Sequence, residues 1–418
     1  MSAPRDSWQD IVHPDDYAAH GYPHDVWTWM RRNDPVHWWE QAEGIPFWAI
    51  TKRSDLVEIS TQPQRFLNGP RLTISHKPEV RLEEFPPTLI QMDNPQHSVF
   101  RKLVSHRFKP QALRRIHGDI ERIGREIVDA LIQTDYGDCD FVKEVSAPLP
   151  IAVIAWLLGV PRSDWRQIFD WTNRLIGSGD PEFRPEGKNE VEGARQTMIE
   201  VFSYFAKLVE EKKKNPADDL ITLFAHAEVD GKRLEFMDVL AWCLIVVVAG
   251  NETTRNATTG GMLAFIENPG ELRRLQQDPK LLTPAVEEVV RWTSPIIHFA
   301  RTASEDYELR GKKIRAGDAL ALFYPSANRD EEVFDEPFRF RIDRRPNRHV
   351  GFGVGEHFCL GVHLARLELM VAYKHLLPRI DEVELAGPVE RLHSSLVGGV
   401  KHLPIRYKLK APARSPAA

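Results

Sequence analysis

The chain has 418 residues, of which 42% are hydrophobic and 28% are charged, and its formal net charge is −5. This length is ample for a large buried core, and so small a net charge gives no electrostatic case for a nucleic-acid partner. Prolines are spread along the sequence, and no internal repeat or long linker divides it. We therefore expect one large domain over residues 1–418.

The three cysteines, Cys139, Cys243 and Cys359, lie far apart in the sequence. Such a set indicates neither a disulfide framework nor a CxxC metal site, and it suits a reducing cytosol. The first ten residues lack the regions of a signal peptide, and the most apolar stretch, 239–249, is about half the length that spans a bilayer. We expect a cytoplasmic protein without a membrane anchor, with a disordered tail at 411–418.

In chain order, the first predicted element is a hairpin at 35–51, in a β-rich part near residues 35–60. Apolar residues at helical spacing then predict helices over 110–133, 192–214 and 233–267. A second β-rich part near 295–325 is predicted from segments that Gly311 and Gly317 interrupt: 299–303, 307–314 and 319–324. A helix is predicted again over 360–378. This order predicts a mainly α fold with a small β portion.

The strongest chemical signal is the glycine-rich segment 352–361, FGVGEHFCLG. Glycines allow tight turns and close approach of the backbone to a flat ligand, and here they would deliver Cys359 to the start of a helix. A helix N-terminus lowers the pKa of a thiol and stabilises the thiolate, which as an iron ligand favours O–O cleavage. A lone cysteine is more often an inert, buried thiol. Four further residues fit the same ligand-binding loop: Phe352, Gly353, Gly361 and Ala365.

This segment resembles the haem-binding loop of the cytochrome P-450 family, and the resemblance covers nearly the whole chain. It implies a helical prism that encloses haem b between a long central helix and the cysteine loop, with Cys359 as the iron ligand. Three segments are similar in sequence to bacterial hydroxylases of sterol side chains and methyl-branched lipids: AGNETTRNA at 249–257, LIQMDNPQH at 89–97 and VGGVKHLP at 397–404. Related terpene hydroxylases look similar. The resemblance thus implies a soluble bacterial monooxygenase.

Glu288 and Arg291 form an ExxR pair on one helix face. Such pairs occur by chance in most helical proteins, but this one lies about seventy residues before Cys359, with the segment PFRF at 337–340 in between. That segment resembles the one that supplies a second arginine in the family. The resemblance implies a buried network of Glu288, Arg291 and Arg339 behind the haem. Loss of one member would prevent haem-bound folding, because an unpaired buried charge costs several kcal/mol.

Gly250 lies inside a predicted helix, where glycine costs about 1 kcal/mol, and a threonine three residues later can hydrogen-bond to the helix carbonyls. Read alone, this indicates a kinked core helix. With the cysteine loop, it matches the oxygen-activating helix of the family. Ala249 and Gly250 would then form a groove over the haem. Glu252 and Thr253 would relay protons for dioxygen activation, as acid and alcohol, and Thr254 is the alternative alcohol.

Haem propionates need cationic or hydrogen-bonding partners. The resemblance implies four, each of which alone would be a solvated or capping side chain: His97, Arg101, Arg301 and His357. It also implies a substrate pocket along 66–92 that includes six further residues: Val246, Ile296, Ile297, His298, Leu396 and Val397. A mostly apolar lining predicts a lipophilic substrate. His298 is the polar exception; we expect a satisfied core histidine, and a contact to a substrate oxygen is the alternative.

Electrons must come from outside, because the sequence has no GxGxxG fingerprint and no cysteine cluster. A basic patch on the cysteine side would suit a small acidic ferredoxin fed by a reductase. It would consist of eight residues: Lys102, Lys109, Arg114, Arg115, Arg341, Arg344, Arg345 and Arg348. The alternative is that these are scattered, solvated charges. Two other functions stay open. One is peroxide-driven, coupling or rearranging chemistry, and the presence of Glu252 and Thr253 disfavours the peroxide-driven form. The other is a non-catalytic haem sensor or electron carrier, in which both residues would be idle.

Overall fold

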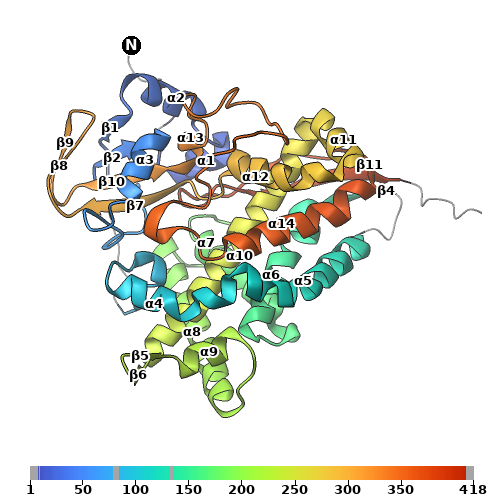
Figure 1. Cartoon of the computed structure of the whole chain (residues 1–418), viewed down its shortest axis with the longest axis horizontal. Helices are drawn as coiled ribbons and strands as arrows, with labels where there is room; N and C mark the ends of the chain where they lie inside the picture. Colours follow the sequence, from blue (N-terminus) through green and yellow to red (C-terminus); the bar gives the residue numbers. More distant parts are fainter. Residues whose placement is uncertain (1–7, 9, 79–83, 132–135, 411–418) are drawn as a thin grey trace, which may run out of the picture.

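The structure, a computed structural model, describes residue 8 and residues 10–78, 84–131 and 136–410. Most of this chain is helical (Figure 1), as the sequence predicts. The α-helices are α1 Pro14–His20, α2 His24–Asn33, α3 Arg53–Ser60, α4 Gln96–Ser105, α5 Pro110–Leu131, α6 Pro148–Leu158, α7 Trp165–Ile176, α8 Glu190–Lys214, α9 Leu220–His226, α10 Phe236–Glu267, α11 Pro269–Gln277, α12 Leu282–Thr293, α13 Tyr324–Ala327 and α14 Val362–Leu376. The tail expected at 411–418 lies outside the described residues.

Both β-rich parts of the sequence join one five-stranded sheet, in the order β1-β2-β10-β7-β3. Its strands are β1 Val36–Trp39, β2 Phe47–Ile50, β3 Phe66–Leu67, β7 His298–Ala303 and β10 Ala319–Phe323. β1 and β2 form the predicted hairpin, with Trp38 opposite Trp48, and β2 runs parallel to β10, with Ala49 opposite Ala321. The sheet therefore joins segments between which most of the helical chain lies.

The other strands of the described chain form one three-stranded sheet and three small antiparallel pairs. The three-stranded sheet consists of β4 Tyr136–Asp140, β11 Ile380–Leu385 and β14 Pro404–Leu409. The hairpins pair β5 Glu228–Val229 with β6 Lys232–Arg233, β8 Tyr307–Leu309 with β9 Lys312–Ile314, and β12 Glu390–Arg391 with β13 Val400–His402.

α10 is the central helix and contacts α6, α7, α8, α12 and α14. A helix that neighbours surround is apolar on all sides, and the buried residues of α10 run from Val239 to Phe265. Within the described chain it is the one helix long and apolar enough to cross a membrane, but more than half of that stretch is buried in the protein. α10 is thus a core helix, as its sequence predicts.

One predicted helix begins later in the structure than its periodicity indicates. The helix predicted from residue 233 begins at Phe236, because residues 232–233 form β6 and pair with β5. The predicted break at Gly311 is confirmed, since β8 and β9 are the arms of a hairpin that turns there. The helices predicted over 110–133 and 360–378 correspond to α5 and α14, and residues 132–133 lie outside the described chain.

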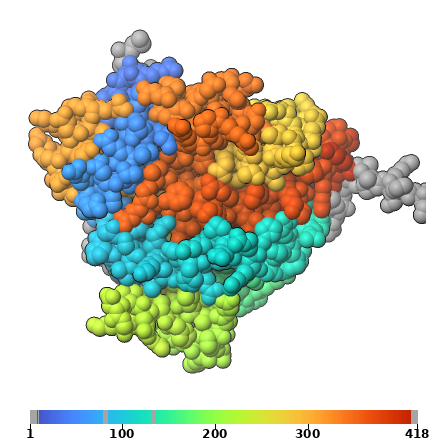
Figure 2. All heavy atoms as spheres, in the orientation of Figure 1, coloured from blue at the N-terminus to red at the C-terminus, as the bar shows by residue number. Residues whose placement is uncertain are grey.

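The segment that carries Cys359 is held between larger parts of the molecule. In Figure 2 the orange and red chain forms a band that borders the blue N-terminal part and the cyan helices. α14 packs along α5 and also contacts α10 and α12. The fit to α5 is close, because a Cβ built on Gly124 would lie 2.3 Å from Cγ1 of Val371. This packing fixes the direction in which the loop before α14 presents its residues.

Candidate active site

A cavity lies where α10, the loop before α14 and the chain leading into β7 meet. Most residues that the sequence assigns to the site line it: His97, Arg101, Val246, Ala249, Gly250, Glu252, Thr253, Ile296, Arg301, Phe352, Gly353, His357, Cys359, Gly361, Ala365, Leu396 and Val397. These residues come from the first quarter, the middle and the end of the chain. The fold therefore brings residues that are distant in sequence into one wall.

Two residues assigned to the substrate pocket lie outside this lining. Ile297 is fully buried in the core cluster that includes Phe323. His298 points to the other face of β7 from Phe299 and Arg301, which line the cavity, because side chains alternate along a strand. Its Nε2 accepts a hydrogen bond from the N–H of residue 74 at 3.0 Å, and burial lowers the pKa of His298 to about 4. These are the contacts of the core histidine that the sequence predicts, and neither Ile297 nor His298 lines the cavity.

A tight loop presents Cys359 to the cavity. The Cys359 N–H donates to the carbonyl of Phe352 at 2.9 Å. Gly355 has a φ of 76°, and a Cβ there would lie 2.2 Å from the carbonyl oxygen of Ser60, so only glycine fits. A Cβ at Gly361, which lines the cavity, would instead enter open space. The loop is therefore rigid where it meets the protein and leaves room where it faces the cavity.

The electrostatic environment of the Cys359 thiol differs from the expectation. Burial raises the pKa of Cys359, while the N–H of Gly361 and the guanidinium of Arg101 oppose that shift. α14 begins only at Val362, after the cysteine. The expected lowering by the helix N-terminus is thus wrong for the polypeptide alone, because burial outweighs it. A metal ion deprotonates a thiol that coordinates it. Bound iron would therefore stabilise the Cys359 thiolate, which the helix N-terminus alone does not.

Basic side chains gather at one side of the cavity. His97 is 1% exposed, its Nε2 has no hydrogen-bond partner among the described residues, and its ring centroid lies 4.0 Å from that of His357. Buried Arg301 and half-buried Arg101 each donate to a backbone carbonyl, at 2.7 Å and 2.5 Å. Burial lowers the pKa of both guanidiniums, and it lowers the pKa of His357 to about 3. Carboxylates of a bound ligand would find cationic and hydrogen-bonding partners here, which fits the propionates of a haem.

The middle of α10 places a carboxyl and a hydroxyl group on the cavity wall. Glu252 is buried and forms an ion pair with Arg255, which also donates to Asn173 of α7 at 2.6 Å. Burial raises the pKa of Glu252, and Arg255 opposes the shift. The Thr253 hydroxyl donates to the carbonyl of Ala249 at 2.8 Å. Both side chains line the cavity, as the acid and alcohol assignment requires.

Gly250 has a packing role that the sequence did not indicate. It lines the cavity, yet a Cβ on it would lie 2.4 Å from Cδ1 of Ile154 in α6. The absence of a side chain therefore allows α6 to approach α10. This close packing explains why a glycine occupies this position inside a helix, whether or not a cofactor is bound.

The ExxR pair is the centre of a buried network. Glu288 and Arg291 are both 0% exposed and form a bidentate pair with two contacts of 2.7 Å. Glu288 also accepts from Nε of Arg344 at 3.1 Å, from Nδ2 of Asn347 at 3.1 Å and from the N–H of Arg341 at 2.9 Å. Several charge-assisted bonds to one carboxylate offset the cost of burying it.

The second arginine of this network is Arg344, not Arg339. The Arg339 side chain is 63% exposed and pairs with Glu336 at 3.1 Å. Its carbonyl joins the network instead, because it accepts from Arg291 at 3.2 Å and from Arg344 at 2.9 Å. The segment is irregular, so no periodicity indicated which arginine faces inward. Arg344 is 4% exposed, and it therefore leaves the predicted surface patch.

Sequence reasoning also missed a buried acid in the cavity wall. Glu368 of α14 is 1% exposed and lines the cavity together with Leu364 and Ala365. Residues three apart share a helix face, so Glu368 lies on the face of Ala365, which the sequence did assign. A glutamate within an apolar stretch, on a face already linked to the site, was the signal that could have found it.

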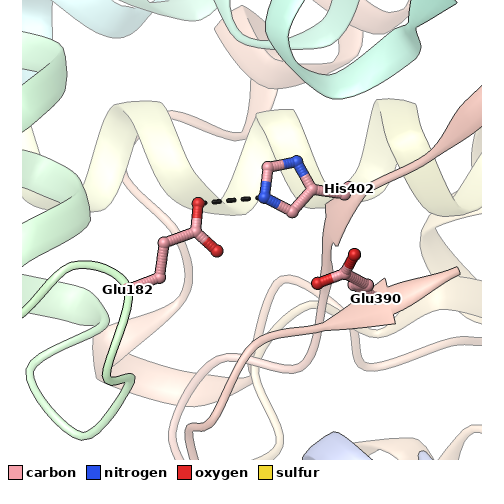
Figure 3. A group of neighbouring side chains, drawn as sticks. All are labelled: Glu182, Glu390 and His402. Atoms are coloured by element: carbon pink, nitrogen blue, oxygen red, sulfur yellow. Dashed lines mark hydrogen bonds and ion pairs between the residues drawn. The ribbon is translucent and has the colours of Figure 1, made fainter.

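A group of three possible metal ligands lies outside this lining: Glu182, Glu390 and His402 (Figure 3). His402 Nε2 contacts Glu182 at 2.9 Å, and its Nδ1 contacts Asp140 at 2.7 Å. Lys401 Nζ lies 3.0 Å from the Glu182 carboxylate. Because both imidazole nitrogens and the lysine already engage carboxylates, the group is an ion-pair network. It connects the chain after α7 to β13.

A mainly helical fold that presents one cysteine on a glycine loop, opposite a helix with an acid and an alcohol, defines the class of haem-thiolate proteins. The comparison with known families agrees, because the family model for cytochrome P450 matches residues 163–385. This range is more than half of the chain. The chain belongs to the cytochrome P450 family.

Relatives cover the chain almost completely. The methyl-branched lipid omega-hydroxylase of Mycobacterium tuberculosis is 38% identical over 90% of this chain and 89% of its own. The steroid C26-monooxygenase of Mycobacterium tuberculosis is 36% identical over 92% of this chain and 89% of its own. A solved cytochrome P450 of Mycobacterium marinum, in complex with pseudoionone, is 33% identical over 95% of this chain and 98% of its own, with a TM-score of 0.88. The chain is thus a cytochrome P450 monooxygenase, and haem is its cofactor, as the resemblance implies.

Proposed function

We propose that this monooxygenase hydroxylates an unactivated C–H bond of a lipophilic substrate, namely a sterol, a methyl-branched lipid or a terpenoid, in the cytoplasm. It would use dioxygen and two electrons from an external ferredoxin and its reductase. The observation that carries the proposal is the large apolar share of the cavity lining, which includes ten residues: Leu72, Ile90, Ile176, Trp242, Ile245, Val246, Ile296, Phe299, Leu396 and Val397. Each buried methylene contributes about 0.8 kcal/mol to binding, so such a wall favours a hydrocarbon that fills it.

The residues of the cavity divide into roles by their chemistry. Haem, when bound, supplies the activation of dioxygen at its iron. Cys359 would hold the iron, and the basic set of His97, Arg101, Arg301 and His357 would bind the propionates. Small and aromatic residues would border the porphyrin: Ala249, Gly250, Phe352, Gly353, Gly361 and Ala365. Glu252 and Thr253 would deliver protons from α10. Glu288, Arg291 and Arg344 lie outside the lining and would stabilise the fold.

The names of the relatives support a lipophilic substrate, since they include a methyl-branched lipid hydroxylase, a steroid monooxygenase and a complex with pseudoionone. A pocket of this kind discriminates between neighbouring substrates by only about 1–3 kcal/mol per methylene. A panel of sterols, branched lipids and terpenoids is therefore the appropriate screen. Binding would shift the Soret band of the ferric protein, and turnover would be measured with a ferredoxin and its reductase.

The decisive test is spectroscopic and chemical. The reduced protein with carbon monoxide should show the strongly red-shifted Soret band of a thiolate ligand, and Cys359→Ala should abolish it. A band typical of an imidazole ligand in the parent protein would overturn the assignment. Turnover with peroxide that exceeds turnover with the ferredoxin system would favour a peroxide-driven enzyme. Normal reduction without turnover of any lipid in the panel would favour a haem sensor or electron carrier.

A further inference from the structure

Glu356 is a carboxylate of the cysteine loop to which the proposed function gives no role. It lies three residues before Cys359, and its Oε1 lies 3.5 Å from Nδ1 of His97 in α4. The Ser98 hydroxyl donates to the same Oε1 at 3.0 Å, and the side-chain amide of Asn94 donates to it as well. These contacts hold the Glu356 carboxylate against one edge of the His97 ring.

The other edge of the His97 ring can meet a ligand. His97 is buried and lines the cavity, yet neither of its ring nitrogens has a hydrogen-bond partner in the described part of the chain. Buried polar groups without partners are rare in folded proteins. Because Nδ1 lies toward Glu356, Nε2 is the nitrogen left for a ligand. A haem propionate at Nε2 would therefore place a carboxylate at each nitrogen of the ring.

Two carboxylates fix the number of protons on the ring. An ionised carboxylate only accepts hydrogen bonds, and a neutral imidazole has one N–H and one bare nitrogen. A neutral ring between two carboxylates would thus direct its lone pair at one of them, whereas an imidazolium can donate to both. Without a ligand, burial lowers the pKa of His97 and Glu356 opposes that shift. The negative propionate would favour the cation further.

The other charged groups around the ring come from three segments. Arg101 of the same helix disfavours a positive charge on His97, and Asp93, just before α4, favours it. The ring of His357 packs against that of His97, but burial lowers the pKa of His357 to about 3, so it adds no charge at neutral pH. Arg301 of β7 also acts on His357. The ring is therefore close to balanced, and the carboxylates at its two nitrogens decide its charge.

We propose that Glu356 is a positioning residue for haem, which holds a proton on the His97 ring so that the ring binds a propionate as an imidazolium. The inference rests on the proposed assignment of His97 to a propionate, and it is independent of the substrate and of the oxygen chemistry. The proton comes from solvent, which reaches Glu356 because its side chain is 18% exposed. Haem binding would thus take up one proton, which forms the second N–H bond of the ring.

The first test observes the ring directly in the haem-loaded protein. In the reduced, carbon-monoxide-bound state, ¹⁵N chemical shifts of labelled histidine distinguish an imidazolium from a neutral ring, and His97→Gln identifies the signals. We expect both His97 nitrogens to carry protons at pH 7.5 in the parent. In Glu356→Gln the amide can donate to Nδ1, so the ring should be neutral. A neutral ring in the parent, or an imidazolium that persists in Glu356→Gln, would overturn the proposal.

The second test follows haem release, measured as transfer of haem to excess apomyoglobin over a pH series. Hydrogen bonds to charged groups contribute more than neutral ones, so Glu356→Gln should release haem about tenfold faster than the parent at pH 7. Since the haem-bound protein binds the proton more tightly, this difference is complete below the pKa of the ring in the haem-free protein. It is lost as pH rises through the pKa in the haem-bound protein.

Ser98→Ala is the control for local structure, because it removes an uncharged hydrogen bond to the same oxygen and leaves the Glu356 carboxylate in place. Its effect on haem release should be the same at every pH. A ratio of release rates between Glu356→Gln and the parent that does not change with pH would show a purely structural role and overturn the proposal. Neither test uses a lipid or turnover, so both remain informative if the proposed substrate class is wrong.

Discussion

At the scale of single residues, two arginines of one segment have opposite surroundings. Arg344 is buried against Glu288, whereas Arg339 is exposed beside Glu336. A buried carboxylate that loses one cationic partner keeps its desolvation cost, while an exposed ion pair contributes little. This difference makes the pair a matched test of the network.

We expect Arg344→Met to destabilise the haem-loaded protein by about 3–5 kcal/mol and to lower its haem content. Arg339→Met, with the same change in side chain, should stay within about 0.5 kcal/mol of the parent. Urea denaturation followed by the Soret band measures both. Equal effects of the two substitutions would contradict the assignment of Arg344 to the network.

Thr253 gives a second prediction at this scale. Thr253→Ala should retain haem but divert electrons to peroxide, lowering product per electron by about tenfold, because it removes the hydroxyl of the proposed proton relay. Thr258 is the control, since it makes the same bond to the carbonyl four residues earlier, at 2.8 Å, but does not line the cavity. Unchanged coupling in Thr253→Ala, or equal loss in Thr258→Ala, would count against the relay.

Motif residues could be predicted from sequence because their chemistry depends on local spacing. Gly355 and Cys359 belong to one loop, and Glu288 and Arg291 to one turn of α12. Arg344 could not be predicted, because its contact with Glu288 depends on the path of an irregular segment. The raised pKa of Cys359 could not be predicted either, since burial is a property of the whole cavity.

At the scale of elements, the close contact between α10 and α6 requires that residue 250 carry no side chain. Gly250→Ala would place a Cβ 2.4 Å from Cδ1 of Ile154, and overpacking of this kind costs about 1–3 kcal/mol. Gly118→Ala in α5 is the control, because its Cβ would meet nothing within 4 Å. Gly118→Ala should therefore stabilise the protein by about 1 kcal/mol, through the higher helix propensity of alanine alone. Thermal denaturation measures both, and recovery in Gly250→Ala with Ile154→Val would locate the cost.

Elements with strong periodicity were predictable, while their partners were not. The apolar run of α10 and the alternation in β10 each indicate a type of element. Nothing in either stretch indicates that β10 runs parallel to β2, which follows from the packing of the whole chain. The start of α10 was also misplaced, because pairing of β6 with β5 overrides helical periodicity at residue 233.

At the scale of the whole molecule, the network around His402 connects distant segments. Burial would lower the pKa of His402, but hydrogen bonds to Asp140 and Glu182 outweigh burial, so the pKa is raised above 6.5. Asp180 and Glu390 add negative charge nearby and Lys401 adds positive charge. Since the folded protein binds the proton more tightly, the stabilisation is complete below the unfolded pKa and is lost as pH rises through the folded pKa.

We therefore expect His402→Gln to be destabilising at pH 6 and nearly neutral above the folded pKa. Urea midpoints of the parent and the variant over a pH series give the difference directly. His226→Gln in α9 is the control, because His226 is exposed and its ring contacts only a backbone carbonyl. A difference between parent and His402→Gln that does not change with pH would show that the imidazole is not protonated in the network.

The predicted basic patch is smaller than the sequence indicates. Arg344 is buried, and Arg341 lies beside Glu336 at 3.2 Å. Six exposed residues remain without a carboxylate partner in the described chain: Lys102, Lys109, Arg114, Arg115, Arg345 and Arg348. Helices α4 and α5 and the chain after residue 340 share one face of the molecule (Figure 2). We propose this face as the docking surface for an acidic electron donor.

Charge reversal tests that surface. Lys102→Glu with Arg345→Glu should slow reduction by an acidic ferredoxin by about tenfold at low salt, because electrostatic steering changes association rates by such factors. The effect should fade at high salt, where the charges are screened. Lys207→Glu with Lys214→Glu, two exposed residues of α8, changes the net charge by the same amount and is the control. Equal slowing by all variants, or none, would remove this face as the docking surface.

The parts of the cavity wall differ in how tightly their residues are packed against the rest of the protein. The cysteine side has close glycine contacts such as that of Gly355 with Ser60, whereas Ile176 lies at the end of α7, and Leu396 and Val397 lie in the segment between β12 and β13. Connecting segments tolerate exchange far better than buried networks. Grafting the corresponding turns from another hydroxylase should therefore redirect which hydrocarbon is oxidised, and where, while the iron, its ligand and its electron supply remain as they are.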